Sequence, residues 1–180
     1  MPFMRRLHVL AIVLGCCLAA GCEKMGPSPG DTTQSTETIF SLSLLDGVLG
    51  QSVPIRVNNQ SIEATIFGKD LGQSALFLCY YQLPKAQEGK TDCPSAIDAE
   101  LKRCLANTGS TVISVKETPS PEHPFMEIIA KSPKKPNHSA RFRVVCTGGN
   151  IQSLLAVTPD TLSKRQAQSL DSMFNDWKGD

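Results

Sequence analysis

Four cysteines supply the most reactive side chains in the central and C-terminal parts of this chain. They are Cys79, Cys93, Cys104 and Cys146. An even number of cysteines is typical of disulfides in exported chains, and residues 1–21 of this chain have the basic, apolar and small-residue parts of an export signal, so we expect two disulfides. The spacings of 14, 11 and 42 residues contain no Cys-x-x-Cys pair, which argues against a zinc site. A catalytic thiol is equally disfavoured, because the later histidines, His123 and His138, lie in proline-rich stretches.

Other catalytic arrangements are missing from the sequence. It contains no His-Glu-x-x-His motif, no phosphate-binding glycine loop and no closely spaced histidines. Gly148 and Gly149 are typical of a hairpin turn. The carboxylates Asp46, Glu63 and Asp70 fall in predicted turns and strands, and their spacing does not bring two of them together for acid–base chemistry. We therefore expect no catalytic residue, no cofactor and no metal ion, so the protein is not expected to be an enzyme.

The N-terminus has the three parts of a secretory signal. Residues 5–14 are first basic and then apolar, and small residues follow them. Residues 18–22, Leu-Ala-Ala-Gly-Cys, then resemble the lipobox of bacterial lipoproteins, with Leu one place early. The resemblance implies cleavage before Cys22 and acylation of its sulfur and new amino group, palmitate included. The alternatives are a plain signal peptide cut near Ala20 and an uncleaved anchor, although the apolar run is shorter than the roughly 20 residues that a spanning helix needs.

The segment after the lipobox separates the anchor from a folded region. Residues 23–38 are rich in Gly, Pro, Ser and Thr without apolar periodicity, which predicts a disordered tether. We therefore expect a signal peptide at 1–21, a lipidated cysteine and tether at 22–38, and one domain at 39–180. In the lipoprotein family an Asp after the cysteine marks retention at the inner membrane. This chain has Glu23, so the resemblance implies the outer membrane, facing the periplasm.

The charge balance is close to neutral. The chain has 18 Lys plus Arg against 17 Asp plus Glu, which gives a formal net charge of +1. Loss of Arg5 and Arg6 with the signal peptide leaves 16 − 17 = −1. Nucleic-acid binding depends on a clustered excess of positive side chains that neutralise phosphates. The composition therefore excludes nucleic acid as the expected partner.

Alternation of apolar and polar residues predicts strands along most of the domain. The predicted strands are Ile39–Leu45, Ser61–Phe67, Ala75–Leu83, Thr111–Glu117, Pro124–Lys131, Ser139–Thr147 and Ile151–Thr158, with a further apolar patch from Val48 to Val57. On the strand Ser139–Thr147, Phe142, Val144 and Cys146 share one face. The pattern indicates an antiparallel sheet of about six strands.

Two segments have helical periodicity. The first helical segment begins after Thr91-Asp92, which we expect to cap its N-terminus, and it ends at Gly109. Its apolar stripe includes Leu101 and Cys104, which we expect to be buried. The second begins at Pro159-Asp160, and its inner stripe ends at Trp177, which we expect to close the core. Two main helices that cover an antiparallel sheet make an α+β fold.

The first helix limits how the cysteines pair. Cys93 and Cys104 are 11 residues apart on it, which is about 16 Å at 1.5 Å per residue and beyond the roughly 7 Å that a disulfide allows. Two connectivities remain. One joins Cys79 to Cys104 and Cys93 to Cys146, and it is slightly favoured because Cys79 and Cys104 are predicted at nearly the same height above the loop that joins strand and helix. The other joins Cys79 to Cys93 and Cys104 to Cys146.

The order of elements resembles a known family. The run Ser43–Gly47, the strand-loop-helix that reaches Leu105, and the segment Leu154–Asp160 before an amphipathic terminal helix look like the DcrB-like proteins, whose fold is related to that of PsbP. The resemblance covers most of residues 39–180, but the four cysteines lie outside the family pattern. Some members are envelope lipoproteins, and related chaperones bind secreted effectors. The resemblance therefore implies protein binding, and it transfers no active-site residue.

One loop concentrates positive charge. Lys131, Lys134 and Lys135 lie close together in the sequence. Arg141 and Arg143 are predicted on the face of the strand Ser139–Thr147 opposite Cys146, and they could extend the set. The ordinary interpretation is a solvated hairpin tip. The functional interpretation is a patch that contacts an acidic protein surface or anionic headgroups.

The sequence thus favours a membrane-anchored lipoprotein that faces the periplasm and binds another protein without catalysis. Immunity proteins, which inhibit delivered toxins, and envelope homeostasis factors are the two classes that fit this description. The alternative is a carrier of a small apolar ligand or lipid, held in a cavity between the helices and the sheet.

Overall fold

The domain is built on one antiparallel sheet of seven strands. The computed structural model describes residues 38–57, 60–83, 93–118 and 124–179. Its strands are β1 (Gln51–Val57), β2 (Gln60–Asp70), β3 (Ala75–Gln82), β4 (Thr111–Thr118), β5 (Phe125–Lys131), β6 (His138–Thr147) and β7 (Asn150–Pro159). Its helices are the 3₁₀ helix η1 (Leu42–Leu45) and the α-helices α3 (Cys93–Thr108) and α4 (Lys164–Asp176).

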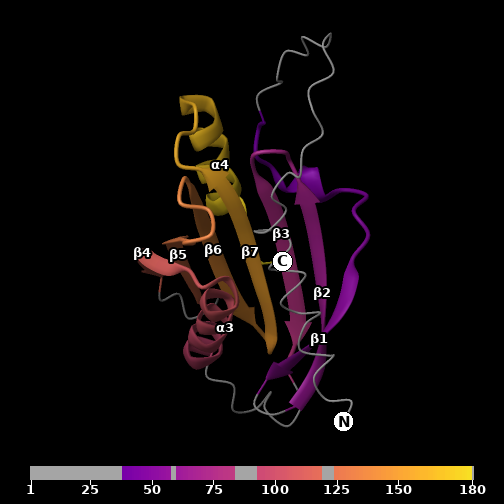
Figure 1. The fold of residues 1–180 in the computed structure, drawn as a ribbon. Coiled ribbons are helices and arrows are strands. Elements are labelled where there is room, and N and C mark those ends of the chain that lie inside the picture. Colours follow the sequence, from indigo (N-terminus) through magenta and orange to yellow (C-terminus); the bar gives the residue numbers. More distant parts are fainter. Residues whose placement is uncertain (1–37, 58–59, 84–92, 119–123, 180) are drawn as a thin grey trace, which may run out of the picture.

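The sheet joins two meanders. Its order is β1-β2-β3-β7-β6-β5-β4, so β1–β3 and β4–β7 each run as successive hairpins (Figure 1). The two meanders meet where β3 pairs with β7, with Cys79 opposite Ser153. Helix α3 lies between them in the chain. Strands β1 and β4 are therefore the two edges of the sheet.

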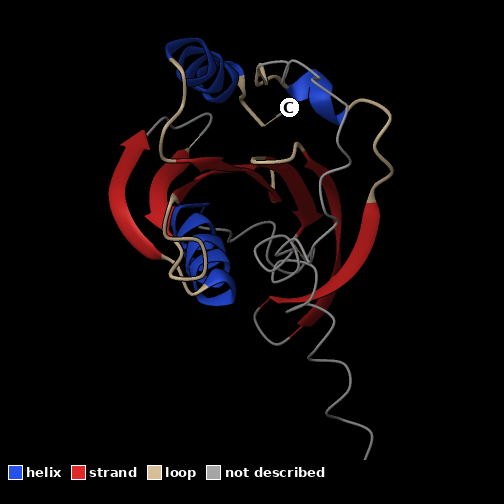
Figure 2. Ribbon diagram, turned by 45° about the horizontal axis from the view of Figure 1, so that its top comes forward, coloured by secondary structure: helices blue, strands red, loops and turns tan. Residues whose placement is uncertain are grey.

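The sheet is curved, and the two α-helices lie on opposite faces. Figure 2 shows α3 inside the arc of strands, with α4 and η1 on the outer side. We call these the concave and the convex face. On β6, Phe142, Val144 and Cys146 belong to the core beneath α3, as their shared face predicts, whereas Val145 belongs to the core beneath α4. Successive side chains of β6 thus alternate between two separate apolar cores, one on each face of the sheet.

The α+β class is confirmed, with seven strands rather than about six. The apolar patch Val48–Val57 contains β1, and helix α3 follows the predicted stripe, with Leu101 and Cys104 buried. The predicted cap, Thr91-Asp92, lies outside the described residues.

The prediction of a strand at Ile39–Leu45 is wrong, because Leu42–Leu45 form the helix η1. Phe40 is 3% exposed and packs in the core beneath α4. Its backbone N–H donates to Ser169 Oγ of α4 at 3.0 Å, so the segment binds a helix rather than a neighbouring strand. Alternation here marks one buried aromatic side chain followed by a tight turn.

Helix α4 begins later than predicted. Strand β7 continues to Pro159, and the helix starts at Lys164 after the N-cap Ser163. Ser163 Oγ accepts from the Gln166 N–H at 3.1 Å, and Gln166 Oε1 accepts from the Ser163 N–H at 3.0 Å. This capping box satisfies two helix-terminal donors and fixes the start. Trp177 is 5% exposed at the other end, which confirms that it closes the core.

Candidate functional site

The predicted anchor lies outside the part of the chain that the structure describes. Cys22 and nearly all of the predicted tether fall within residues 1–37. Among the described residues, no helix is long and apolar enough to cross a bilayer. The described residues with functional potential therefore lie in the folded domain.

A disulfide ties α3 to the sheet. Cys93, the first residue of α3, is bonded to Cys146 of β6, with a Cα–Cα distance of 5.6 Å. This bond agrees with one of the two predicted connectivities and excludes the one that joins Cys79 to Cys93. Cys79 and Cys104 carry free thiols, half-buried and buried respectively, so one of the two predicted disulfides is present in this structure.

The concave face holds a buried polar cluster next to these thiols. Glu100 of α3 is 2% exposed. Its carboxylate accepts from the Tyr81 hydroxyl at 2.9 Å and from Arg103 Nε at 2.8 Å. The Cys104 thiol donates to the same carboxylate at 3.5 Å. Cys79 lies two residues from Tyr81 on β3 and packs against the same core. We call these five residues the concave cluster.

Burial and the Glu100 charge keep the thiols protonated. Burial, followed by the negative charge of Glu100, raises the pKa of Cys79 from 9.0 to about 11, while Arg103 and a hydrogen bond with Ser153 oppose the rise. The same two causes raise the pKa of Cys104 well above its ordinary value. Burial and Glu100 also raise the pKa of Tyr81. Because the thiolate is the nucleophile, neither cysteine is activated in this state.

The convex face holds a second polar cluster. Glu127 of β5 accepts from Arg143 Nε at 2.8 Å and from Arg141 Nε at 2.9 Å. Arg143 also donates to the Phe174 carbonyl, and its guanidinium lies 4.4 Å from the Phe125 ring centre. Arg141 lies 4.4 Å from the Phe174 ring centre. We call Glu127, Arg141, Arg143, Phe125 and Phe174 the convex cluster.

This arrangement corrects the predicted basic patch. Arg143 is 2% exposed, and Arg141 is ion-paired with both Glu127 and Asp171, so neither extends a surface patch. Strand alternation places both on the face away from Cys146, as predicted, but α4 covers that face. Of the lysines, Lys131 pairs with Asp160 at 2.8 Å.

The surface that remains from the predicted patch is small. Lys134 is exposed and Lys135 is half-buried. Hydrogen bonds from Lys131 and Ser139 hold the pKa of Asp160 below its usual value. That carboxylate therefore stays negative beside the loop and offsets its positive charge.

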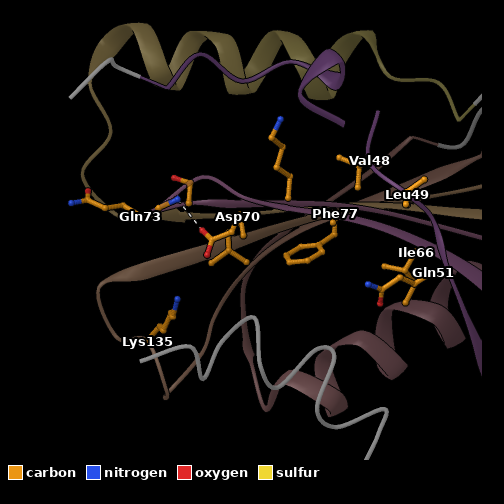
Figure 3. Close-up of a pocket in the computed structure, with 14 residues that line it drawn as sticks. Val48, Leu49, Gln51, Ile66, Asp70, Gln73, Phe77 and Lys135 are labelled. Carbon is orange, nitrogen blue, oxygen red and sulfur yellow. Dashed lines mark hydrogen bonds between the residues drawn. The ribbon is translucent and has the colours of Figure 1, made fainter. Parts of the chain in front are cut away.

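A pocket of about 350 Å³ lies on β2 and β3 (Figure 3). Figure 3 shows Phe77 between Ile66 on one side and Asp70 on the other, with Lys135 beyond. A Cβ at Gly68 would lie 2.6 Å from the Phe77 ring, so glycine leaves room for the ring. Small-molecule pockets usually have volumes of about 300 to 1,000 Å³ and mainly apolar walls. This one is at the lower end and mixes apolar with charged residues, so it supports a ligand carrier weakly.

Edge strand β4 is the feature that the sequence did not single out. All of Thr111–Glu117 is exposed. Val112, Ile113 and Val115 are 39%, 57% and 55% exposed. Within the described part of the chain, β4 pairs only with β5, and Ile113 lies at an irregularity of that pairing. The strand therefore presents unpaired backbone groups and aliphatic side chains together.

The other edge is different. Strand β1 turns its aliphatic side chains inward, with Val53 and Ile55 at 7% and 2% exposure. Between them stands Pro54, which has no N–H to offer to a further strand. Edges that are not meant to pair commonly carry proline or charge. The comparison favours β4 as the edge that accepts a partner.

Comparisons with known proteins do not add an identity. No protein-family model matches the chain, and no curated protein matches it.

Proposed function

We propose that this chain is a lipid-anchored lipoprotein that faces the periplasm and binds another protein without catalysis. An immunity protein, which inhibits a toxin, and an envelope homeostasis factor are the two classes that fit this role. The observation that carries the proposal is edge strand β4, with Val112, Ile113 and Val115 exposed at an open sheet edge.

Two properties of β4 support protein binding. An edge strand has backbone N–H and C=O groups that face away from the sheet, and an extended segment of a partner can bond them. The exposed aliphatic side chains gain free energy when a partner removes them from water. Lys116 and Glu117 follow Val115 and add one charge of each sign, which lets a partner match the strand by charge.

The rest of the domain supports a rigid scaffold for this edge. Strand β4 follows α3 directly, and the Cys93–Cys146 bond fixes the start of α3 on the sheet. At the other end of α3, the Ser132 hydroxyl donates to the Thr108 carbonyl at 3.5 Å. A scaffold that holds its binding strand in place loses little conformational entropy when the partner binds. In the proposal, Cys22 and the tether keep this edge close to the membrane.

The test compares full-length chains that carry a C-terminal affinity tag and are cross-linked in the envelope. Val115→Lys places a charge on β4, and Leu49→Lys makes the same kind of change at a side chain that is 87% exposed elsewhere. We expect one dominant cross-linked partner for the wild type and for Leu49→Lys, with a yield at least about tenfold lower for Val115→Lys, which corresponds to about 1.4 kcal/mol. Equal thermal stability of both variants would show that folding is unaffected.

Two results would contradict the proposal. One is an undiminished partner yield for Val115→Lys, which removes β4 from the interaction. The other is the absence of a cross-linked partner for the wild type. A Cys22→Ser chain tests the anchor in the same experiment. It is expected in the soluble periplasmic fraction, and its persistence in the membrane fraction would contradict lipidation at that residue.

A further inference from the structure

The two free thiols come from elements that run in opposite directions. The start of α3 is bonded at Cys93 to Cys146, which pairs with Ile151, and Ile151 pairs with Tyr81 near the end of β3. The end of α3 lies by Ser132, just after β5. The end of β5 pairs with the start of β6, which pairs with the end of β7, and the end of β7 pairs with the start of β3. The start of β3 therefore lies at the same end of the sheet as the end of α3. Helix α3 is therefore antiparallel to β3.

This direction brings Cys79 and Cys104 to the same level. Tyr81 and Glu100 are in contact, since the hydroxyl donates to the carboxylate at 2.9 Å. Cys79 lies two residues before Tyr81 on β3, which is a distance of roughly 6.6 Å along the strand. Cys104 lies four residues after Glu100 on α3, which is a distance of roughly 6 Å along the helix in the same direction. The thiols also lie close enough to affect each other electrostatically.

We propose that Cys79 and Cys104 form a second disulfide, which makes the pair a redox-sensitive modification site between β3 and α3. Both S–H bonds break and one S–S bond forms. The two electrons and the two protons pass to the disulfide of a thiol oxidase, of the class that acts in an oxidising compartment, whose S–S bond breaks to give a dithiol. Because Cys93 and Cys146 are already bonded, Cys79 and Cys104 are each other's remaining partner among the described cysteines.

The second bond would change the concave cluster in a defined way. Glu100 would lose the Cys104 thiol as a donor but keep Tyr81 and Arg103. Helix α3 would be fixed to β6 at its start and to β3 at its later half. Because the Cys104 thiol is buried, the Cys79 thiol is half-buried and both are protonated in the folded dithiol, we expect the bond to form chiefly during folding, before α3 closes over β3. This inference does not depend on the proposed partner.

The test is a peptide map of the full chain after expression in the periplasm and denaturation in the presence of a thiol-blocking maleimide. Trypsin separates the four cysteines into the peptides 70–85, 91–102, 104–116 and 144–164. Without reduction, we expect 70–85 linked to 104–116, and 91–102 linked to 144–164. Maleimide on Cys79 and Cys104 with the other bond intact would overturn the proposal, and so would any other pairing of these two cysteines.

A variant pair measures the effect of the bond. Cys104→Ser removes the proposed bond and leaves Cys93–Cys146. Ser153→Ala is the control, because it changes a neighbour of Cys79 and keeps all four cysteines. We expect Cys104→Ser to lower the Tm of oxidised protein by about 5 to 15 °C. We expect the same substitution to change the Tm by less than half as much when the compared proteins are both fully reduced. Equal shifts in the two states would overturn the proposal even if the map were incomplete.

Discussion

On each face of the sheet a glutamate is buried between the sheet and a helix, and the two glutamates differ in which element carries them and which residues bind them. On the convex face, Glu127 belongs to the sheet and binds two arginines of the neighbouring strand. On the concave face, Glu100 belongs to the helix itself and reaches Tyr81 on the sheet. Arg103, the cationic partner of Glu100, comes from the same helix. Glu127 therefore fixes two strands to each other, whereas Glu100 fixes a helix to a strand.

The chemistry of the donors separates the two clusters further. The convex donors are guanidinium groups, which do not lose their protons at any ordinary pH. Two of the concave cluster's groups are thiols, which can lose protons or electrons. The donors of the convex cluster thus keep one chemical state, whereas the two thiols of the concave cluster can change theirs. We therefore expect the convex cluster to contribute more to stability and the concave cluster to respond to oxidants and to alkaline pH.

Glu127→Gln should give the largest loss of stability. It removes the counter-charge of Arg143, whose side chain is 3% exposed. Leaving a buried charge without its partner costs about 3 to 5 kcal/mol. Urea unfolding followed by circular dichroism measures the loss. Asp171→Asn is the matched control, because that carboxylate is 65% exposed and its ion pair should contribute only about 0 to 1 kcal/mol. Similar losses for the two variants would mean that burial does not strengthen the ion pairs of Glu127.

Glu100→Gln should cost less, although Glu100 is the more deeply buried side chain. Its partner Arg103 is 22% exposed and can turn toward water. The amide oxygen can still accept from Tyr81, so we expect a loss of about 1 to 3 kcal/mol. The same urea titration measures it. A loss larger than that of Glu127→Gln would reverse the comparison between the faces.

The sequence predicted the elements of both faces better than their contacts. The stripe through Leu101 and Cys104 and the shared face of Phe142, Val144 and Cys146 follow from local periodicity, and both are confirmed. Alternation also separated Arg143 from that face. The alternation could not show that α4 covers Arg143, because the periodicity of a single strand carries no information about which distant helix packs on it.

The same limit explains the other errors and omissions. Phe40 alternates with serines as in a strand, but its binding site is α4, far along the chain. The exposure of β4 depends on the order of strands in the sheet, which places it at an edge. Its composition of Val, Ile, Thr and Ser fits an inner strand equally well. The length of the first helix reduced the possible cysteine pairings to two connectivities, and only the folded structure distinguishes between them, through the Cys93–Cys146 bond.

The smallest effect concerns the thiol of Cys79 and its response to pH. Its pKa is about 11 in the folded protein against an ordinary 9.0, so the folded state holds the proton more tightly than the unfolded chain. The stabilisation is therefore complete below pH 9 and is lost as the pH rises toward 11. A Cys104→Ser chain keeps this thiol free, and the Cys79→Ser/Cys104→Ser chain removes it. Between pH 8 and 10 the first should lose at most about 1.3 kcal/mol more than the second, because each pH unit between the two pKa values corresponds to about 1.4 kcal/mol. The difference cancels the titration of lysines and tyrosines common to both chains. Parallel stability profiles would mean that folding leaves the pKa of Cys79 at its ordinary value, so that the Cys79 thiol is not influenced by burial or by Glu100 of the concave cluster.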